Sequence, residues 1–138
     1  MITAHDIMSE EVVVIYDDML IRQVAHLMLR NRVSSLPVVS KEIGLVGIIT
    51  ITDLFKMLNH ASQQKKKEQF DKQIAISKEM KVGEVMTKNI ISITPKTTLR
   101  EIVHLVVEKG IHAFPVLENG KLVGIVGRHD ILNAIFAY

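Results

Sequence analysis

The stretch Leu45-Val46-Gly47-Ile48 recurs as Leu122-Val123-Gly124-Ile125 later in the same chain of 138 residues. A proline between apolar residues precedes each copy, as Leu36-Pro37-Val38 and as Phe114-Pro115-Val116. The offset is 115 − 37 = 78 at the prolines and 124 − 47 = 77 at the glycines. A nearly constant offset over matched motifs indicates an internal duplication. The chain therefore contains two copies of one folding unit, and the second copy has lost one residue between the two motifs.

The duplication divides the chain into three parts. Residues 1–58 hold the first repeat, residues 82–138 hold the second, and residues 59–81 lie between them. The intervening segment is polar and charged and contains Lys65-Lys66-Lys67. We expect this segment to be a solvated linker or a helical extension, with a basic contact surface for an anionic partner as the alternative.

Each repeat is predicted to fold as β-α-β-β-α, which places the chain in the mixed α/β (α+β) class. A β-branched run predicts a first strand at 12–16 and again at 90–94. Apolar residues at helical spacing follow each run, and Gly110 is expected to end the second of these helices.

Two further strands and a helix complete each repeat. In the first repeat the strands are expected at about 36–39 and 45–49. In the second repeat the turn between them contains Asn119-Gly120, a pair that favours a tight hairpin. The last helix should begin near Thr52 in the first repeat and near His129 in the second.

The composition limits the class of protein. Hydrophobic residues make up 48% of the chain and aromatic residues only 4%, so a core of Val, Ile, Leu and Met is expected. The net charge of +2 does not suggest a nucleic-acid-binding protein, and the absence of cysteine excludes disulfides, thiolate metal sites and cysteine nucleophiles. No signal peptide and no apolar run near the roughly 18 residues of a membrane helix is present, so a cytoplasmic protein is expected.

The repeated motifs resemble those of the cystathionine-β-synthase (CBS) domain family. One motif is the small-residue lead into the proline, at 32–39 and at 110–117. The other closes each repeat, as Gly47-Ile48-Ile49-Thr50-Ile51-Thr52-Asp53 and as Gly124-Ile125-Val126-Gly127-Arg128-His129-Asp130. The resemblance implies two repeats packed about a pseudo-twofold axis, with two equivalent clefts. The ligands that it implies are AMP, ADP, ATP or S-adenosylmethionine.

By this resemblance each cleft combines the closing motif of one repeat with apolar and small residues of the other. One cleft would contain Thr50, Thr52, Asp53, Met86, Ile91, Ile111, His112 and Ala113. The opposite cleft would contain Gly127, Arg128, His129, Asp130, Met8, Val13, Val33, Ser34 and Ser35. The apolar members would enclose the adenine; core packing is the alternative for the Val, Ile and Met positions.

The closing motif of the first repeat suits a nucleotide on chemical grounds. A helix that starts directly after a strand presents free N–H groups and a positive helix end, which attract a phosphate. The hydroxyls of Thr50 and Thr52 can add hydrogen bonds, and the Asp53 carboxylate can accept from the paired hydroxyls of a ribose. The same residues could instead cap the helix without any ligand.

The second closing motif departs from the pattern. Gly127 stands where a hydroxyl residue is expected, and Arg128 could compensate because a guanidinium grips phosphate bidentately. We therefore expect unequal clefts, with the Asp53 cleft reading ribose and a short phosphate and the Asp130 cleft preferring more phosphate charge.

The function expected is that of a regulatory module which catalyses nothing, requires no cofactor or metal, and binds an adenine nucleotide as its regulatory ligand. A homodimer is expected, with Phe55 and Phe136 as candidate contacts, together with an effector protein of unknown identity. The alternative is a structural interaction domain with empty clefts, and a nucleotide-processing enzyme is a third possibility. A thermal-shift screen would separate the first two.

Overall fold

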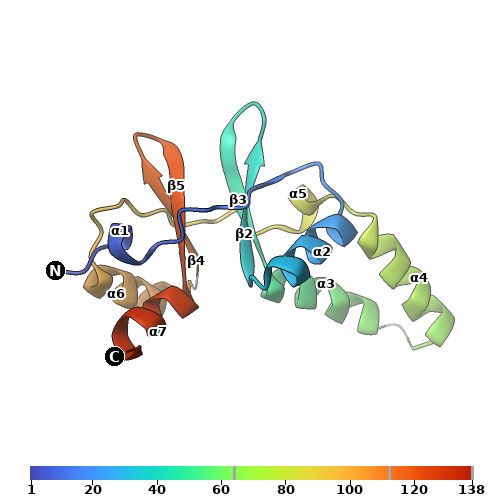
Figure 1. Cartoon of the computed structure of the whole chain (residues 1–138). Helices are drawn as coiled ribbons and strands as arrows, with labels where there is room; N and C mark the ends of the chain where they lie inside the picture. The colour runs from blue at the N-terminus through green and yellow to red at the C-terminus, as the bar shows by residue number, and fades with distance from the viewer. Residues whose placement is uncertain (64, 112, 138) are drawn as a thin grey trace. The chain divides into compact units, whose positions relative to one another are not determined.

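The chain folds into two compact units, each with its own hydrophobic core (Figure 1). The computed structural model describes residues 1–63, 65–111 and 113–137. The first-repeat unit is Val13–Asn89, and the second-repeat unit is Met1–Val12 together with Ile90–Tyr138. The units differ from the repeats drawn along the sequence, because the residues just before each repeat's first strand pack into the unit of the other repeat.

The first-repeat unit is a small sheet flanked by helices. Its elements are β1 (Ile15–Tyr16), α2 (Ile21–Asn31), β2 (Ser35–Ser40), β3 (Gly44–Thr50), α3 (Ile51–Ser62), α4 (Lys67–Lys78) and α5 (Val82–Val85). The strand order is β1-β2-β3, with β1 parallel to β2 and β2 antiparallel to β3.

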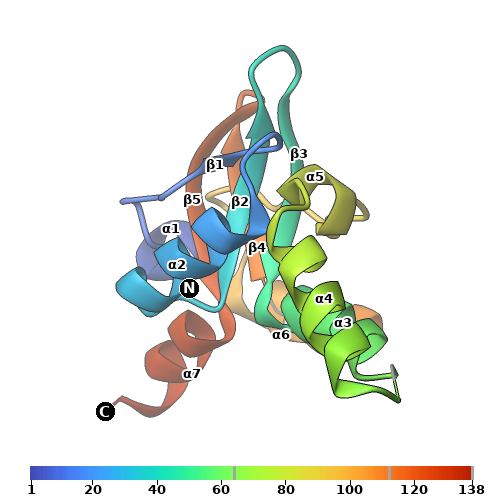
Figure 2. The same ribbon diagram turned by 90° about the vertical axis from the view of Figure 1, so that its right-hand side faces the viewer.

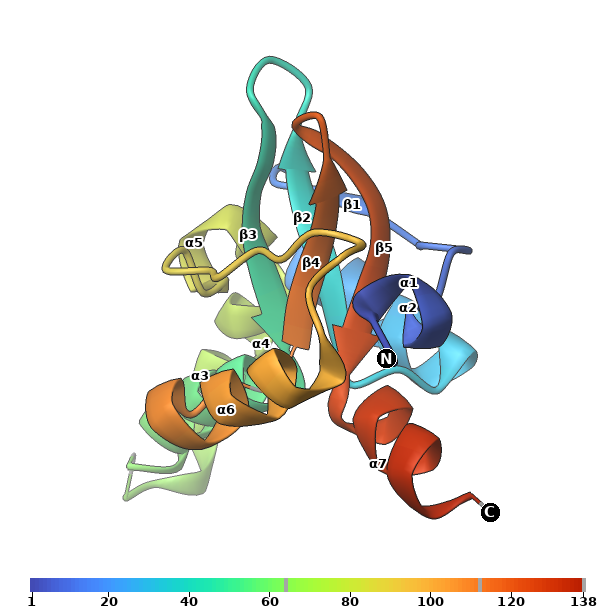
Figure 3. The same ribbon diagram turned by 90° about the vertical axis from the view of Figure 1, so that its left-hand side faces the viewer.

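The second-repeat unit repeats this plan with a smaller sheet. Its elements are α1 (Ala4–Ile7), α6 (Leu99–Lys109), β4 (Ala113–Glu118), β5 (Lys121–Gly127) and α7 (Arg128–Phe136). β4 and β5 are antiparallel, and Figure 3 shows β5 leading directly into α7.

The first strands are shorter than predicted. In the first repeat only Ile15–Tyr16 of the run 12–16 forms a strand, and the strand predicted at 90–94 is reduced to a single bridge between Ile93 and Val116. The reason is local. The N–H of Thr94 donates to the hydroxyl of Thr97 at 3.0 Å, so the chain turns away from the sheet immediately after Ile93.

The turns confirm the predicted hairpin and helix end. Asn119 and Gly120 both have positive φ, 52° and 78°, as a two-residue hairpin turn requires. Gly110 ends α6 with φ 64°, and Arg32 ends α2 in the same left-handed conformation. The β2–β3 loop is one residue longer than the β4–β5 turn, which accounts for the shift in offset between the repeats.

The two cores are built mainly from Ile, Val, Leu and Met, as the composition predicts. The first core contains Ile15, Ile21, Val24, Met28, Leu36, Val38, Ile49 and Val82. The second contains Ala4, Ile93, Ile102, Phe114, Val116, Val126 and Ile131. Val82 and Ala4 are both fully buried, and they come from segments at the start of one repeat that lie in the unit of the other. Those segments are therefore part of the fold.

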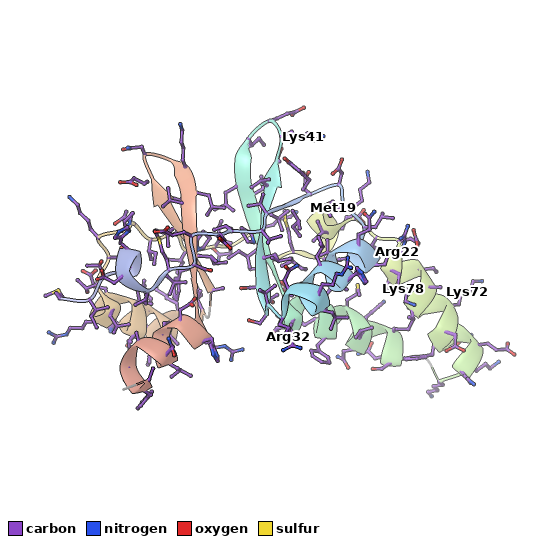
Figure 4. The ribbon with its side chains drawn as sticks, viewed as in Figure 1. Met19, Arg22, Arg32, Lys41, Lys72 and Lys78 are labelled. Carbon is purple, nitrogen blue, oxygen red and sulfur yellow. The ribbon has the colours of Figure 1, made fainter. Side chains whose placement is uncertain are left out.

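Most of the segment 59–81 is helical. α3 runs to Ser62, and α4 packs against both α3 and α2 (Figure 1, Figure 2). Arg22 on α2 reaches toward α4 and pairs with Glu79 at 2.9 Å (Figure 4). Figure 4 also shows Lys72 and Lys78 on α4. None of the described helices has the length and apolar character that a membrane crossing needs.

Each unit contains a short segment that forms a one-turn helix and then pairs with the sheet, and we name it the bridging segment: residues 81–87, with α5, in the first-repeat unit and 3–9, with α1, in the second. Thr87 and Ile48 exchange backbone hydrogen bonds of 2.8 and 2.9 Å. Ser9 and Ile125 exchange equivalent bonds of 3.0 and 3.1 Å. Both bridging segments therefore attach to the edge of a sheet at corresponding positions.

A glycine makes each attachment possible. A Cβ on Gly47 would lie 2.6 Å from the Met86 sulfur and 2.8 Å from the Thr87 carbonyl oxygen. A Cβ on Gly124 would lie 2.5 Å from the sulfur of Met8. The bridging segments thus approach the sheets too closely for any larger residue.

We predict that Gly47→Ala lowers the free energy of unfolding by about 1–3 kcal/mol, because the added methyl must push the bridging segment off β3. Chemical denaturation measures this directly. Gly127→Ala is the matched control, since its Cβ would meet only an Asp130 oxygen at 3.7 Å and its φ of −111° suits alanine. Equal stability of the two variants would contradict the close-approach explanation.

Candidate functional site

The candidate site begins where a strand passes into a helix with no intervening loop. β3 ends at Thr50 and α3 begins at Ile51; in the second unit β5 ends at Gly127 and α7 begins at Arg128. The first-turn N–H groups of a helix have no partner within the helix. Both junctions therefore present donors and a positive helix end, as the closing motifs predict.

Asp53 is the most fully bonded side chain at the first junction. It is 7% exposed, and its Oδ2 accepts hydrogen bonds from the Thr50 N–H at 2.9 Å and from the Thr50 hydroxyl at 3.0 Å. Its Oδ1 accepts from the Thr87 hydroxyl at 2.8 Å. The Asp53 N–H in turn donates to the Thr50 hydroxyl at 3.1 Å. The capping arrangement that was the alternative interpretation of this motif is therefore formed.

Thr87 is a site residue that sequence reasoning missed. It stands at the end of the bridging segment and is held beside Asp53 by its backbone pairing with Ile48. A signal was present, because Met86-Thr87 and Met8-Ser9 place a hydroxyl residue after methionine at the same point near the start of each repeat.

The other polar groups at the first junction are partly engaged. The Ile51 N–H donates to the Ser34 carbonyl at 3.0 Å, which places Ser34 beside the start of α3. Ser35 pairs with Thr50 across β2 and β3. Thr52 is exposed on the first turn of α3. Thr52 is thus the polar residue of Thr50-Ile51-Thr52-Asp53 that is exposed to solvent.

The second junction is less tightly bonded. The Gly127 N–H donates to Asp130 Oδ2 at 2.8 Å, and this is the one donor that the described residues place on that carboxylate. Glycine has no side-chain oxygen, so the hydroxyl cap that Thr50 supplies to α3 has no counterpart at α7. Asp130 is half-buried, and Arg128 and His129 are exposed. The structure therefore leaves Asp130 with more acceptor capacity than Asp53.

The predicted base-enclosing residues divide between the two units. Val13, Val33, Ser34, Ser35 and Met86 lie in the unit of Asp53, and Met8, Ile91, Ile111 and Ala113 lie in the unit of Asp130. His112 lies outside the described residues. The residues predicted for each cleft are therefore divided between the units. Among the described residues outside the closing motif, only the methionine of each set shares the unit of its aspartate: Met86 with Asp53, and Met8 with Asp130.

Several of these residues also contribute to packing. Met86 and Val33 are half-buried against the first core, and Met8, Ile91 and Ile111 are half-buried against the second. Ala113 is buried, and Val13 is 40% exposed. Core packing, the alternative interpretation, is therefore found at these five half-buried positions. Each of them also keeps part of its surface exposed.

Corresponding hollows adjoin the two aspartates. The hollow in the first-repeat unit has a volume of about 310 Å³ and is lined by Asp53, Lys56, Met57, His60, Gln73, Ser77, Met80, Glu84 and Val85. The hollow in the second-repeat unit has a volume of about 320 Å³ and is lined by Ile2, Asp6, Ile7, Asp130, Asn133 and Ala134. The first hollow gains Gln73 and Ser77 from α4, which has no counterpart among the described elements of the second unit.

One acid in the second hollow is held in its charged form. The backbone N–H of Thr3 donates to Asp6 at 2.8 Å and lowers the pKa of that carboxyl, and the Thr3 hydroxyl acts in the same direction. Because Asp6 and Asp130 face the same hollow, this hollow is a poor place for a phosphate. A phosphate near α7 would instead be drawn to the side that carries Arg128.

Comparison with known proteins gives the family. The model of the CBS domain matches residues 4–60 and 82–137. An uncharacterized protein of Methanocaldococcus jannaschii is 31% identical, over 94% of this chain and 89% of its own length. A homoserine O-acetyltransferase of Methanosalsum zhilinae is also 31% identical over 94% of this chain, but this match covers only 23% of the enzyme.

Solved structures of other proteins have the same fold as this chain. A CBS-domain protein of Agrobacterium tumefaciens has a TM-score of 0.82 at 23% identity, covering 97% of this chain and 93% of the other. CBSX2 in complex with AMP has a TM-score of 0.77 at 25% identity, covering 99% and 98%. With the family model matched twice, over most of the chain and at the two sequence repeats, this chain belongs to the CBS-domain family.

Proposed function

We propose that this chain is a regulatory module that binds an adenosine-containing nucleotide at sites built around Asp53 and Asp130. One observation carries the proposal: in both units a carboxylate stands on the first turn of a helix that begins directly at the end of a strand. Family membership and the structural similarity to CBSX2 in complex with AMP support the choice of ligand class.

The chemistry of the junction suits the two polar parts of a nucleotide. An ionised carboxylate accepts hydrogen bonds and cannot donate, so it matches a ribose diol, which offers two O–H donors. The start of a helix attracts an anion, so it matches a phosphate. The adenine would lie against half-buried apolar residues, and each unit has a methionine among those predicted: Met86 in the unit of Asp53 and Met8 in the unit of Asp130.

We propose that the two sites differ in the phosphate they prefer. The Asp53 site offers the Thr52 hydroxyl, while its Thr50 hydroxyl is already bonded to Asp53. The Asp130 site offers the exposed guanidinium of Arg128. A guanidinium can bond two phosphate oxygens at once, so the Asp130 site would favour the more highly phosphorylated nucleotide.

The proposed mechanism is linkage. A nucleotide that binds one conformation of the module better than another increases the population of that conformation. An effector protein that recognises the favoured conformation then responds to the nucleotide concentration. No catalysis is proposed. The matched homoserine O-acetyltransferases carry about three-quarters of their length outside the region that resembles this chain.

The first prediction concerns binding itself. Each site that AMP fills at 100 times the Kd of that site should raise the free energy of unfolding by about 2.7 kcal/mol, measured by urea denaturation, and the nucleotide should be recovered unchanged. The double variant Asp53→Ala/Asp130→Ala is the control and should show no increase. No stabilisation of the unsubstituted protein by AMP, ADP, ATP or S-adenosylmethionine would favour a purely structural interaction domain.

A second prediction concerns the inequality of the sites. Arg128→Ala should weaken ATP binding about tenfold or more by titration calorimetry and change AMP binding much less, because it removes a charge-assisted phosphate contact. Arg30→Ala removes another exposed arginine, on α2 and outside the predicted clefts, and should change neither. If Asp53→Ala and Asp130→Ala each lost equal affinity for AMP and for ATP, the sites would be equivalent and the proposed difference would be wrong.

We also propose that the module forms a homodimer through its helices. Exposed apolar residues recur at matching positions of the two repeats: Leu29 (79% exposed) and Val107 (76%), Phe55 (64%) and Leu132 (53%). Phe136 on α7 is 73% exposed. The same positions are apolar and exposed in both repeats. They suit contact with a second copy of the chain, because that copy carries the same surface.

Phe55→Glu and Phe136→Glu should therefore each halve the molecular mass measured by light scattering, because a buried carboxylate in the contact is costly. Ile43→Glu is the matched control, since Ile43 is equally apolar and 79% exposed but lies in the β2–β3 loop. A monomeric unsubstituted protein, or dimers unaffected by both substitutions, would refute this surface as the contact.

A further inference from the structure

The hydroxyl of Thr87 donates a hydrogen bond to Asp53, the carboxylate that the proposed function assigns to the ligand. Asp53 accepts three hydrogen bonds from protein donors, two on Oδ2 and one on Oδ1. A carboxylate has about four lone-pair positions. One position therefore remains, and a ribose diol brings two donors.

The three bonds differ in how easily they can be released. The two bonds to Oδ2 come from Thr50 and belong to the cap of α3, together with the reciprocal bond from the Asp53 N–H. The bond to Oδ1 comes from a hydroxyl outside the helix, on the bridging segment. Rotation of that hydroxyl would leave the backbone pairing between Thr87 and Ile48 intact. Thr87 is also exposed, so its released hydroxyl can bond to water.

We propose that Thr87 is a positioning residue that lowers the affinity of the Asp53 site, because the diol of a nucleotide must displace its hydroxyl from Oδ1. The inference rests on the proposed function and adds the regulation of one site. Occupancy of that site releases Thr87, so the bridging segment 81–87 loses a side-chain anchor only when the ligand is bound.

Among the described residues of the second-repeat unit, no side chain competes in this way. Ser9 takes the place of Thr87, and its backbone pairs with Ile125, but among the described residues the carboxylate of Asp130 has the Gly127 N–H as its donor. A diol can therefore reach Asp130 without displacing a side chain. The Asp130 site should fill first and the Asp53 site at higher nucleotide concentration, which widens the concentration range over which the module responds.

Titration calorimetry with AMP tests this proposal in the Asp130→Ala background, where the Asp53 site is read alone. Adding Thr87→Val should tighten binding about tenfold, since the competing charge-assisted hydrogen bond is lost while the side-chain shape is kept. Thr87→Ser keeps the hydroxyl and should restore the weaker binding. Thr87→Ala serves as a second hydroxyl-free variant and should behave as Thr87→Val does.

The matched control uses the other repeat. In the Asp53→Ala background, Ser9→Ala should change AMP affinity by less than about twofold, because the Ser9 hydroxyl makes no bond to Asp130. Unchanged or weaker AMP binding in both hydroxyl-free Thr87 variants would overturn the proposal while leaving the proposed function intact. Absence of AMP binding by the unsubstituted protein would overturn both.

Discussion

Two backbone pairings hold the bridging segments against the sheets: Thr87 pairs with Ile48, and Ser9 pairs with Ile125. Each is a two-way exchange of hydrogen bonds next to a glycine that leaves no space for a Cβ. Through them the segment that begins one repeat becomes part of the unit of the other repeat, and Val82 and Ala4 are buried in the cores. The same constraint sets the hydroxyl of Thr87 against Asp53. The packing of the fold and the chemistry of the junction therefore share one cause.

The duplication provides an internal comparison. The two junctions keep the carboxylate, the extended strand and the immediate helix start, but they differ in what surrounds the carboxylate. Thr50 caps α3, whereas Gly127 gives α7 no side-chain cap. Asp53 has a donor from the bridging segment, and Asp130 has none among the described residues. One junction is thus largely satisfied by the protein itself, while the other retains acceptor capacity for a ligand. A duplicated module that diverges in this way can respond to one nucleotide over two concentration ranges.

Local chemistry explains which parts of the fold could be predicted from sequence. The Asn119-Gly120 hairpin, the helix end at Gly110 and both strand-to-helix junctions depend on residues that lie close together in the chain, and all of them are found. The strand expected at 90–94 does not form. Its β-branched residues favour a strand, but they do not reveal the turn that the bond between Thr94 and Thr97 closes. Each bridging segment lies in the unit of the other repeat because of contacts between residues distant in sequence. Hydrophobic periodicity does not reveal such contacts.

At the candidate site, too, the local sequence left part of the structure undetermined. The motif around Asp53 correctly indicated a carboxylate at a helix start, but it could not separate a cap from a ligand site, because both use the same residues at the same spacing. Thr87 was missed because its role arises from a contact across 34 positions of sequence. Met86 and Ile111 were ambiguous for a physical reason, since a half-buried apolar residue can support a core and face a ligand at once.

The proposed function requires that Asp53 and Asp130 hold the diol of a ribose, and a ligand without that diol tests this requirement. Titration calorimetry would compare AMP with its 2′,3′-dideoxy analogue, which keeps the base and the phosphate. The analogue should bind at least about tenfold more weakly, since it cannot donate to either carboxylate. Equal affinity of AMP and the dideoxy analogue would show that the carboxylates serve only to cap their helices.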